Sequence, residues 1–409
     1  MKNVTTAVLV ISLIILAGMI FMLFTVKGTF TARDKDSAEE QIWEEVGSEE
    51  REIAEDDLTP VAVSALETAR ISGGEIQVRW SDETDDRVSV YSVLRRDMSG
   101  ENGDWSEVGN VISDGTAGDG DNIFSDVLEG SGLKQFEYRV DVEVSDKETC
   151  KSHEGAHSIR SNALICLDPG HYEGKNAVTG DDSYGYEENI ATLKIGLSLR
   201  DLLEENYGIS TVMTRETEHI TIEGYSDEVL DSKHISLRGK YAEGCDYFIS
   251  LHTNSNRDNA NGYPTFGQPV SINKPVVLVG VPALQNETAL AIANAIGQNI
   301  SAVYENEGLC TVTGFETASP GNIREWSDAF NDGLDKCGAV CVRHGSSGDY
   351  YGILRGASEV GVPGLIVEHG FHSNAEVRRE AMEGTLTDQW AAADAAGIAE
   401  GLGFSEIVG

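Results

Sequence analysis

The sequence predicts an α/β fold, in which a mostly parallel, twisted sheet is flanked by helices, preceded by a small all-β sandwich and an N-terminal transmembrane helix. Three observations predict this order. An uncharged apolar run opens the chain, apolar residues alternate with period two from about residue 60, and strands alternate with helical patterns after about residue 161. A change of period along a chain indicates separate structural regions.

The charge of the chain excludes one broad class of partner. Among 409 residues, 69 are Asp or Glu and 30 are Lys or Arg, and the formal net charge is −39. Such a surface repels the phosphates that nucleic-acid-binding proteins must neutralise, and it repels anionic lipid headgroups. We therefore expect no nucleic-acid partner, and any membrane attachment must come from an inserted segment.

The N-terminal run has the length of a membrane span. Residues 4–26 carry no charge, and at about 1.5 Å per residue they cover roughly 30 Å of hydrocarbon. The run ends in Lys27 and lacks the small-residue cleavage pattern of a signal peptide. We predict a transmembrane signal anchor over residues 1–27, with residues 28–59 as an acidic linker that stays solvated.

Short runs with period two follow the linker, at residues 77–80, 88–94 and 136–142. Turns rich in Gly and Asp separate them, which is typical of a small antiparallel sandwich. The order of aromatic and apolar residues resembles a fibronectin type III domain over residues 60–150. We interpret this domain as a spacer, with a carbohydrate- or protein-binding module as the alternative, and residues 151–162 as a linker.

Strands alternate with helices in the remainder of the chain. Because this alternation is typical of an α/β domain with a mostly parallel sheet, the functional groups are expected at the carboxyl ends of the strands. The predicted strands lie at 163–168, 209–214, 247–251, 276–281 and 365–368, and the predicted helices at 188–204, 288–303 and 388–401.

Residue types that bind zinc follow three of these strands. His171 follows the first strand, His252 the third and Glu368 the last, and either Glu187 or Glu188 opens the first helix, where the helix dipole favours a carboxylate. Two imidazoles, one carboxylate and an open position form the ligand set of a catalytic zinc site, and a further carboxylate can take a proton from water.

Seven motifs occur in the order seen in zinc-dependent N-acetylmuramoyl-L-alanine amidases, and over about residues 163–402 the chain resembles that family. They are 164–171 (LICLDPGH), Glu188 at a helix start, 212–215 (VMTR), 236–238 (SLR), 248–255 (FISLHTNS), 353–355 (ILR) and 364–374 (GLIVEHGFHSN). The loop that follows 164–171 departs from the family, which usually has a Gly-rich segment there.

The resemblance implies a zinc amidase catalytic domain, which we place at residues 163–405. It implies one Zn²⁺ per chain on His171, Glu188 and His252, with Glu368 as the catalytic carboxylate. The substrate would be peptidoglycan, cleaved at the amide bond between N-acetylmuramic acid and L-alanine, so the domain is expected outside the cell membrane. Asn254 is a candidate substrate-binding residue because it lies close to His252. A regulatory protein partner stays unidentified.

Two other functions are compatible with parts of the sequence. Residues 153–157 (HEGAH) match the HExxH motif of zinc metallopeptidases, which requires His153 and His157 on one helix face. Their neighbours are polar and Gly155 lies inside the motif, so a linker is the preferred interpretation. The second alternative is a catalytically silent scaffold that binds the cell wall. Three further histidines are interpreted as packing or surface groups: His344, His369 and His372.

Overall fold

The computed structural model describes residues 63, 65–81, 88–99, 103–113, 121–130, 132–144, 149–150, 157–220, 222–255, 273–327, 335–346 and 348–407. The predicted anchor and acidic linker, over residues 1–59, lie outside these ranges. None of the helices in the described ranges has both the length and the apolar character needed to cross a bilayer.

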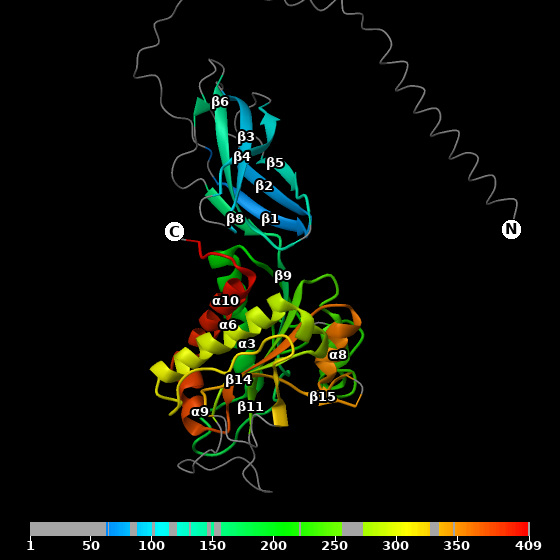
Figure 1. The fold of residues 1–409 in the computed structure, drawn as a ribbon, viewed down its shortest axis with the longest axis vertical. Helices are drawn as coiled ribbons and strands as arrows, with labels where there is room; N and C mark the ends of the chain where they lie inside the picture. The colour runs from blue at the N-terminus through cyan, green and yellow to red at the C-terminus, as the bar shows by residue number, and fades with distance from the viewer. Residues whose placement is uncertain are drawn as a thin grey trace, which may run out of the picture. The chain divides into compact units, whose positions relative to one another are not determined.

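Two antiparallel sheets form the N-terminal region (blue to cyan-green in Figure 1). The first sheet has the order β1 (Glu67–Ser72), β2 (Glu75–Ser81) and β5 (Asp121–Val127). The second has the order β4 (Ser106–Ile112), β3 (Val88–Asp97), β6 (Gln135–Val144) and β7 (Thr149–Cys150). Alternate side chains are buried in one core, among them Trp80, Tyr91 and Tyr138. The period-two pattern therefore arises because one face of each sheet is buried.

The segment predicted as a linker, 151–162, is partly a strand. Residues His157–Ser161 form β8, which pairs antiparallel with β6. The sequence here is polar and lacks a buried alternating face, which is why no strand was expected. This strand also bears on the HExxH motif, because His157 lies in an extended segment and not on a helix.

One seven-stranded sheet forms the core of the C-terminal domain, in the order β10-β9-β11-β17-β12-β14-β13. The strands are β9 (Leu164–Pro169), β10 (Ser210–Met213), β11 (Tyr247–Asn254), β12 (Val276–Val279), β13 (Arg324–Glu325), β14 (Ala339–Val342) and β17 (Gly364–Phe371).

The sheet is mixed, but five of its six strand pairings are parallel, as the mostly parallel sheet predicted from the sequence requires; the one antiparallel pairing was not predicted. Strands β10, β9, β11 and β17 are parallel, whereas β12 pairs antiparallel with β17, and β14 and β13 run with β12. In the register, His252 and Val276 both lie opposite Glu368. Strand β12 thus begins at the edge of the sheet where β11 ends and runs in the opposite direction.

Helices cover both faces of this sheet (Figure 1). Side chains from α3 (Glu188–Tyr207), α6 (Glu287–Asn306) and α10 (Leu386–Leu402) share one core cluster with one sheet face. Side chains that pack on the other face come from α8 (Gly352–Glu359) and from Ile235 and Ala242, which flank α5 (Ser236–Lys240). Side chains of β12 lie in the core clusters on both faces of the sheet, with Val277 in the first and Leu278 in the second. Burial on both faces explains its continuous apolar run.

Short elements complete the domain and were not expected from the sequence. A six-residue helix or a two-residue strand has too few residues to display a period, so pattern analysis does not detect it. These elements are α4 (Asp227–Ser232), the 3-10 helix η2 (Val281–Gln285), β15 (His344–Gly345), β16 (Gly348–Asp349) and α9 (Ala375–Met382).

Candidate metal centre

His171 lies just beyond the carboxyl end of β9. Its backbone has a φ of 63°, in the left-handed region that few non-glycine residues adopt, and the chain turns sharply here. The preceding residue, Gly170, makes room for the second histidine, because a Cβ at this position would lie 2.4 Å from the His252 ring. Any larger residue would displace that ring.

Glu188 is the first residue of α3, at the positive end of the helix dipole. Its side chain is 2% exposed, and its Oε1 accepts hydrogen bonds from the backbone N–H of Thr253 at 2.9 Å and from His252 Nδ1 at 3.1 Å. Its Oε2 accepts from Asn176 Nδ2 at 2.6 Å and lies 3.3 Å from His171 Nε2. The carboxylate is therefore held between the two imidazoles.

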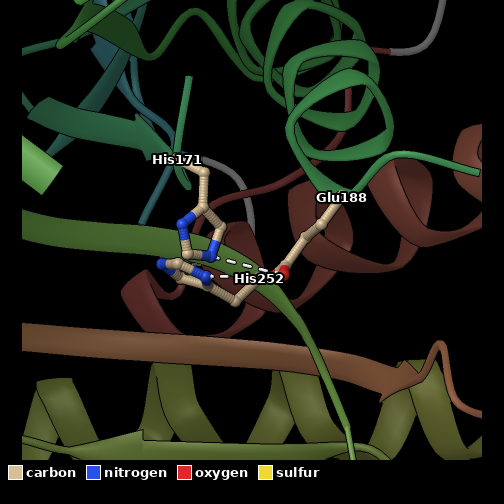
Figure 2. A group of neighbouring side chains, drawn as sticks. All are labelled: His171, Glu188 and His252. Carbon is tan, nitrogen blue, oxygen red and sulfur yellow. Dashed lines mark hydrogen bonds and ion pairs between the residues drawn. The ribbon is translucent and has the colours of Figure 1, made fainter. Parts of the chain in front are cut away.

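His252 projects from β11, the strand beside β9. One nitrogen of each histidine and one oxygen of Glu188 lie within 4.8 Å of one another. Figure 2 shows the three side chains converging from the end of β9, the first turn of α3 and β11, with the carboxylate bridging both rings. Residues far apart in the sequence thus form one cluster.

The three groups shift one another's pKa values. Burial works against the charge on each, but the positive charge of His171 and hydrogen bonds from both histidines hold the pKa of Glu188 well below its usual value. Glu188 and Asp231 raise the pKa of His171 to about 10 against the effect of burial. Burial lowers the pKa of His252. The ionised carboxylate of Glu188 is therefore stabilised by the positive charge of His171 beside it.

Glu368 lies opposite His252 in the register of β17 and β11. Burial, followed by the negative charge of Glu188, raises its pKa to about 8. Its Oε2 is buried and has no hydrogen-bond partner among the described residues. The guanidinium of Arg355 donates to the backbone oxygens of Asp349 and Tyr350. The carboxylate is therefore available for a proton or a ligand.

A pocket of about 480 Å³ is lined by the three clustered residues and the nearby carboxylate: His171, Glu188, His252 and Glu368. Asn254 also lines it; its backbone oxygen accepts from the N–H of His372, and its side-chain oxygen from the N–H of Ser255. One wall is apolar and comes mainly from the start of α8 and the residue before α5: Ile235, Tyr351, Gly352 and Ile353. The pocket thus combines a polar base with an apolar wall, as small-molecule sites do.

A buried ion pair supports the strand ends beneath the cluster. Asp168 Oδ1 accepts from Arg238 Nη2 at 2.8 Å, and both side chains are at most 1% exposed. Thr214 and Ser250 donate to the same carboxylate from the strands on either side of β9. Arg215 donates to the backbone oxygens that follow, at Pro169 and Gly170. These hydrogen bonds hold the turn that carries His171 in place.

The structure distinguishes the two glutamates that competed for the cluster. Glu188 contacts both histidines, whereas Glu187 precedes the helix as its N-cap and contacts neither of them in the described part of the chain. His153 lies outside the described residues, and His157 pairs with Glu137 at 2.6 Å. The described half of the HExxH motif is thus engaged in the sandwich and not in the cluster.

Several residues at the site were not predicted from the sequence. His372, interpreted as a packing or surface group, is 2% exposed and lines the pocket, and its Nδ1 lies 3.0 Å from the hydroxyl of Thr253. It lies one residue beyond β17, and the register with β11 shifts between Glu368 and Phe371, so a strand period could not relate it to Glu368. Asn176 and Asp231, which contact His171, come from loops and short helices that show no period.

The donor set fits a metal ion. Two imidazole nitrogens and a carboxylate oxygen are ligands that zinc prefers, and three protein ligands leave a position for water. The buried, unpartnered Oε2 of Glu368 borders the same pocket. The fold and this cluster together define an α/β protein with a candidate metal centre at the carboxyl ends of its strands.

The sequence of residues 165–400, more than half of the chain, matches the family described as N-acetylmuramoyl-L-alanine amidase. The chain therefore belongs to this amidase family. Its fold and the family together support a hydrolase that acts on peptidoglycan. No curated protein matches the chain.

Several solved structures are similar to the chain at low identity. The CwlD amidase from Clostridioides difficile, solved in complex with the GerS lipoprotein, is 17% identical with a TM-score of 0.40; the match covers 59% of this chain and 98% of CwlD. AmiC2 of Nostoc punctiforme is 20% identical with a TM-score of 0.36, over 58% of this chain and 94% of AmiC2. Ami1 from Mycobacterium smegmatis is 19% identical with a TM-score of 0.38, over 59% and 97%.

Proposed function

We propose that the protein is a zinc-dependent N-acetylmuramoyl-L-alanine amidase that hydrolyses the amide bond between N-acetylmuramic acid and the L-alanine of the stem peptide. The observation that carries the proposal is the convergence of His171, Glu188 and His252 beside Glu368 in one pocket. The first three would hold one Zn²⁺, and the fourth would act as the catalytic carboxylate. Membership of the amidase family supports the choice of bond.

Each of these residues has a definite task in the proposed reaction. When bound, zinc supplies a Lewis acid that polarises the amide carbonyl and lowers the pKa of water. Glu368 takes the proton of the attacking water on its carboxylate and then delivers it to the leaving amine of L-alanine. Asn254, at the pocket wall, would hydrogen-bond the peptide.

Purified protein provides the test of this proposal, with zinc content and the release of new L-alanine amino termini from murein as readouts. We expect stoichiometric zinc and activity in the wild type. Glu368→Gln should retain zinc and lose activity by about 10²- to 10⁴-fold, the range for removal of a general acid-base group. His171→Ala should lose both.

His344→Ala is the matched control, since this exposed histidine pairs only with Glu325 at the surface in the described part of the chain. It should retain both zinc and activity. Zinc binding by His171→Ala equal to that of the wild type would move the metal site elsewhere. Zinc-loaded wild type that releases no amino termini would favour the alternative of a silent cell-wall-binding scaffold.

The proposal extends to where the protein works. Peptidoglycan lies outside the cell membrane, so we propose a single-pass anchor over residues 1–27 with the amidase domain on the cell-wall side. The uncharged run at residues 4–26 supports this, and the net charge of −39 leaves insertion as the route to a membrane. In cells that express the protein, it should resist alkaline extraction from membranes, and added protease should digest it in spheroplasts. Release by alkali would contradict the anchor.

We also propose that the region before the amidase domain is a fibronectin type III-like spacer. Two antiparallel sheets around one core support this reading. A spacer holds the catalytic domain away from the membrane and requires no affinity of its own. A purified fragment of residues 60–162, which includes β8, should therefore not sediment with murein, whereas sedimentation would favour a binding module.

A further inference from the structure

Both ring nitrogens of His171 face a carboxylate. Nε2 lies 3.3 Å from Glu188 Oε2, within the candidate metal centre. On the opposite side of the ring, Nδ1 lies 3.1 Å from Asp231 Oδ1. The two nitrogens of an imidazole are distinct, and the hydrogen bond made by one determines which of them can offer a lone pair.

Asp231 is itself held in place. It lies on α4, where the neighbouring Leu230 is fully buried and packs the helix against the domain. Its Oδ1 is 3.6 Å from Nη1 of Arg238, and the Asp231 side chain is 12% exposed. Arg238 is in turn anchored by Asp168 beneath the strand ends. The carboxylate is thus constrained from the protein side and can orient the ring that it contacts.

We infer that Asp231 is a positioning residue for the metal centre. It accepts the Nδ1–H hydrogen bond of His171 and so directs the Nε2 lone pair toward Glu188 and His252. Partners of this kind fix the tautomer and the orientation of a ligating imidazole and increase its basicity. The inference rests on the proposed function in one respect, that a metal ion binds the three residues.

A purely structural role for Asp231 does not account for its contact with His171. Arg238 already has a fully buried partner in Asp168, so neutralising this guanidinium does not require Asp231. The packing of α4 comes from Leu230 and from Asp227, which caps the preceding loop through the backbone N–H of Ile220. The contact that Asp231 alone provides, among the described residues, is the one with His171 Nδ1.

The experiment measures zinc affinity of the full chain by competition with a chromophoric chelator, together with the unfolding midpoint of the metal-free protein. Asp231→Ala should bind zinc about 10- to 100-fold more weakly, the range for loss of an outer-shell partner. Asp231→Asn, whose amide oxygen can still accept from Nδ1, should recover much of the affinity. Glu228→Gln removes an exposed carboxylate from the same helix and should change nothing.

The outcomes are distinct. Wild-type affinity in Asp231→Ala, with zinc bound by the wild type, would overturn this inference and leave the proposed function intact. Absence of zinc binding by the wild type would overturn both. If Asp231→Ala does not fold, Asp231→Asn is measured instead. A zinc affinity between those of the wild type and His171→Ala would support the positioning role. A lowered unfolding midpoint of the metal-free protein with unchanged zinc affinity would overturn it.

Discussion

Asp168 shows how one buried carboxylate can organise a site that it does not enter. Arg238, Thr214 and Ser250 all donate to it, and it is fully buried. Burial raises the pKa of a carboxyl, but the charge of Arg238 and the two hydroxyl donors outweigh this and hold the pKa of Asp168 below its usual 3.8. The ionised form is therefore the one that the fold requires.

Asp168→Asn should destabilise the protein by about 3–5 kcal/mol at pH 7, because the buried Arg238 loses its close counter-charge and keeps only Asp231, 3.6 Å away. A carboxyl with a lowered folded pKa contributes its full stability above the unfolded pKa and loses it as the pH falls through the folded pKa. The difference between wild type and variant should therefore shrink below about pH 4. Urea unfolding at pH 7 and pH 3 measures it, and an equal difference at both would contradict the ionised pair.

The neighbouring glutamates at the start of α3 provide a second test at the residue scale. Glu188→Gln should weaken zinc binding by more than about 100-fold, beyond the range of outer-shell partners, because it removes a charged ligand. Glu187→Gln is the matched control, one residue away and without a contact to either histidine in the described structure. Zinc titration of both variants is the measurement. Loss of zinc in Glu187→Gln alone would reverse the assignment.

At the scale of elements, α5 and α8 cross with their backbones nearly in contact. A Cβ on Gly356 would lie 1.9 Å from the backbone oxygen of Ser236, and a Cβ on Gly239 would lie 1.9 Å from that of Ile353. The two glycines therefore allow a close approach that no larger residue permits. Residues on these two helices, Arg238 and Ile353, contribute to the ion pair and to the pocket wall.

Gly356→Ala should lower the free energy of unfolding by about 1–3 kcal/mol, the range for overpacking, even though alanine favours helices. The helices must separate to admit the methyl group, so the pocket wall should move as well. Gly74→Ala, in the turn between β1 and β2, meets no atom within 4 Å and serves as the control. Denaturant unfolding compares the two, and equal stability would show that the crossing can relax.

At the scale of the whole molecule, binding of a metal ion to the candidate centre would stabilise the folded state. The three candidate ligands come from the turn after β9, from α3 and from β11, and the unfolded chain has no such cluster. A ligand that binds only the folded state stabilises it, by about 2.7 kcal/mol at a hundredfold excess over the dissociation constant. Zinc should therefore raise the unfolding midpoint of the wild type, and a chelator should reverse the rise.

His171→Ala is the comparison for this effect. Its midpoint should not respond to zinc, because one of three ligands is missing. Thermal unfolding with and without zinc measures both proteins. A rise of equal size in the variant would mean that zinc stabilises the protein through other groups.

The sequence alone determined the location of the long elements and the types of residue at the strand ends. Buried strands such as β9 and β17 and the long helices α3, α6 and α10 lie within a few residues of their predicted positions, because burial of a face imposes a period on the sequence. The strand ends also pointed to His171, His252 and Glu368 as candidates, since strand ends of an α/β sheet meet at one edge. The roles given to them and to Glu188 came from the family resemblance.

Only the tertiary structure decided the direction of β12, the choice between Glu187 and Glu188 as the residue that faces the histidines, and the presence of Asp231 and His372 at the site. None of these features leaves a period in the sequence. Strand direction depends on where the preceding segment ends, and contacts from short helices depend on side chains brought together from distant parts of the chain. These contacts form only when the sheet and its helices have packed together.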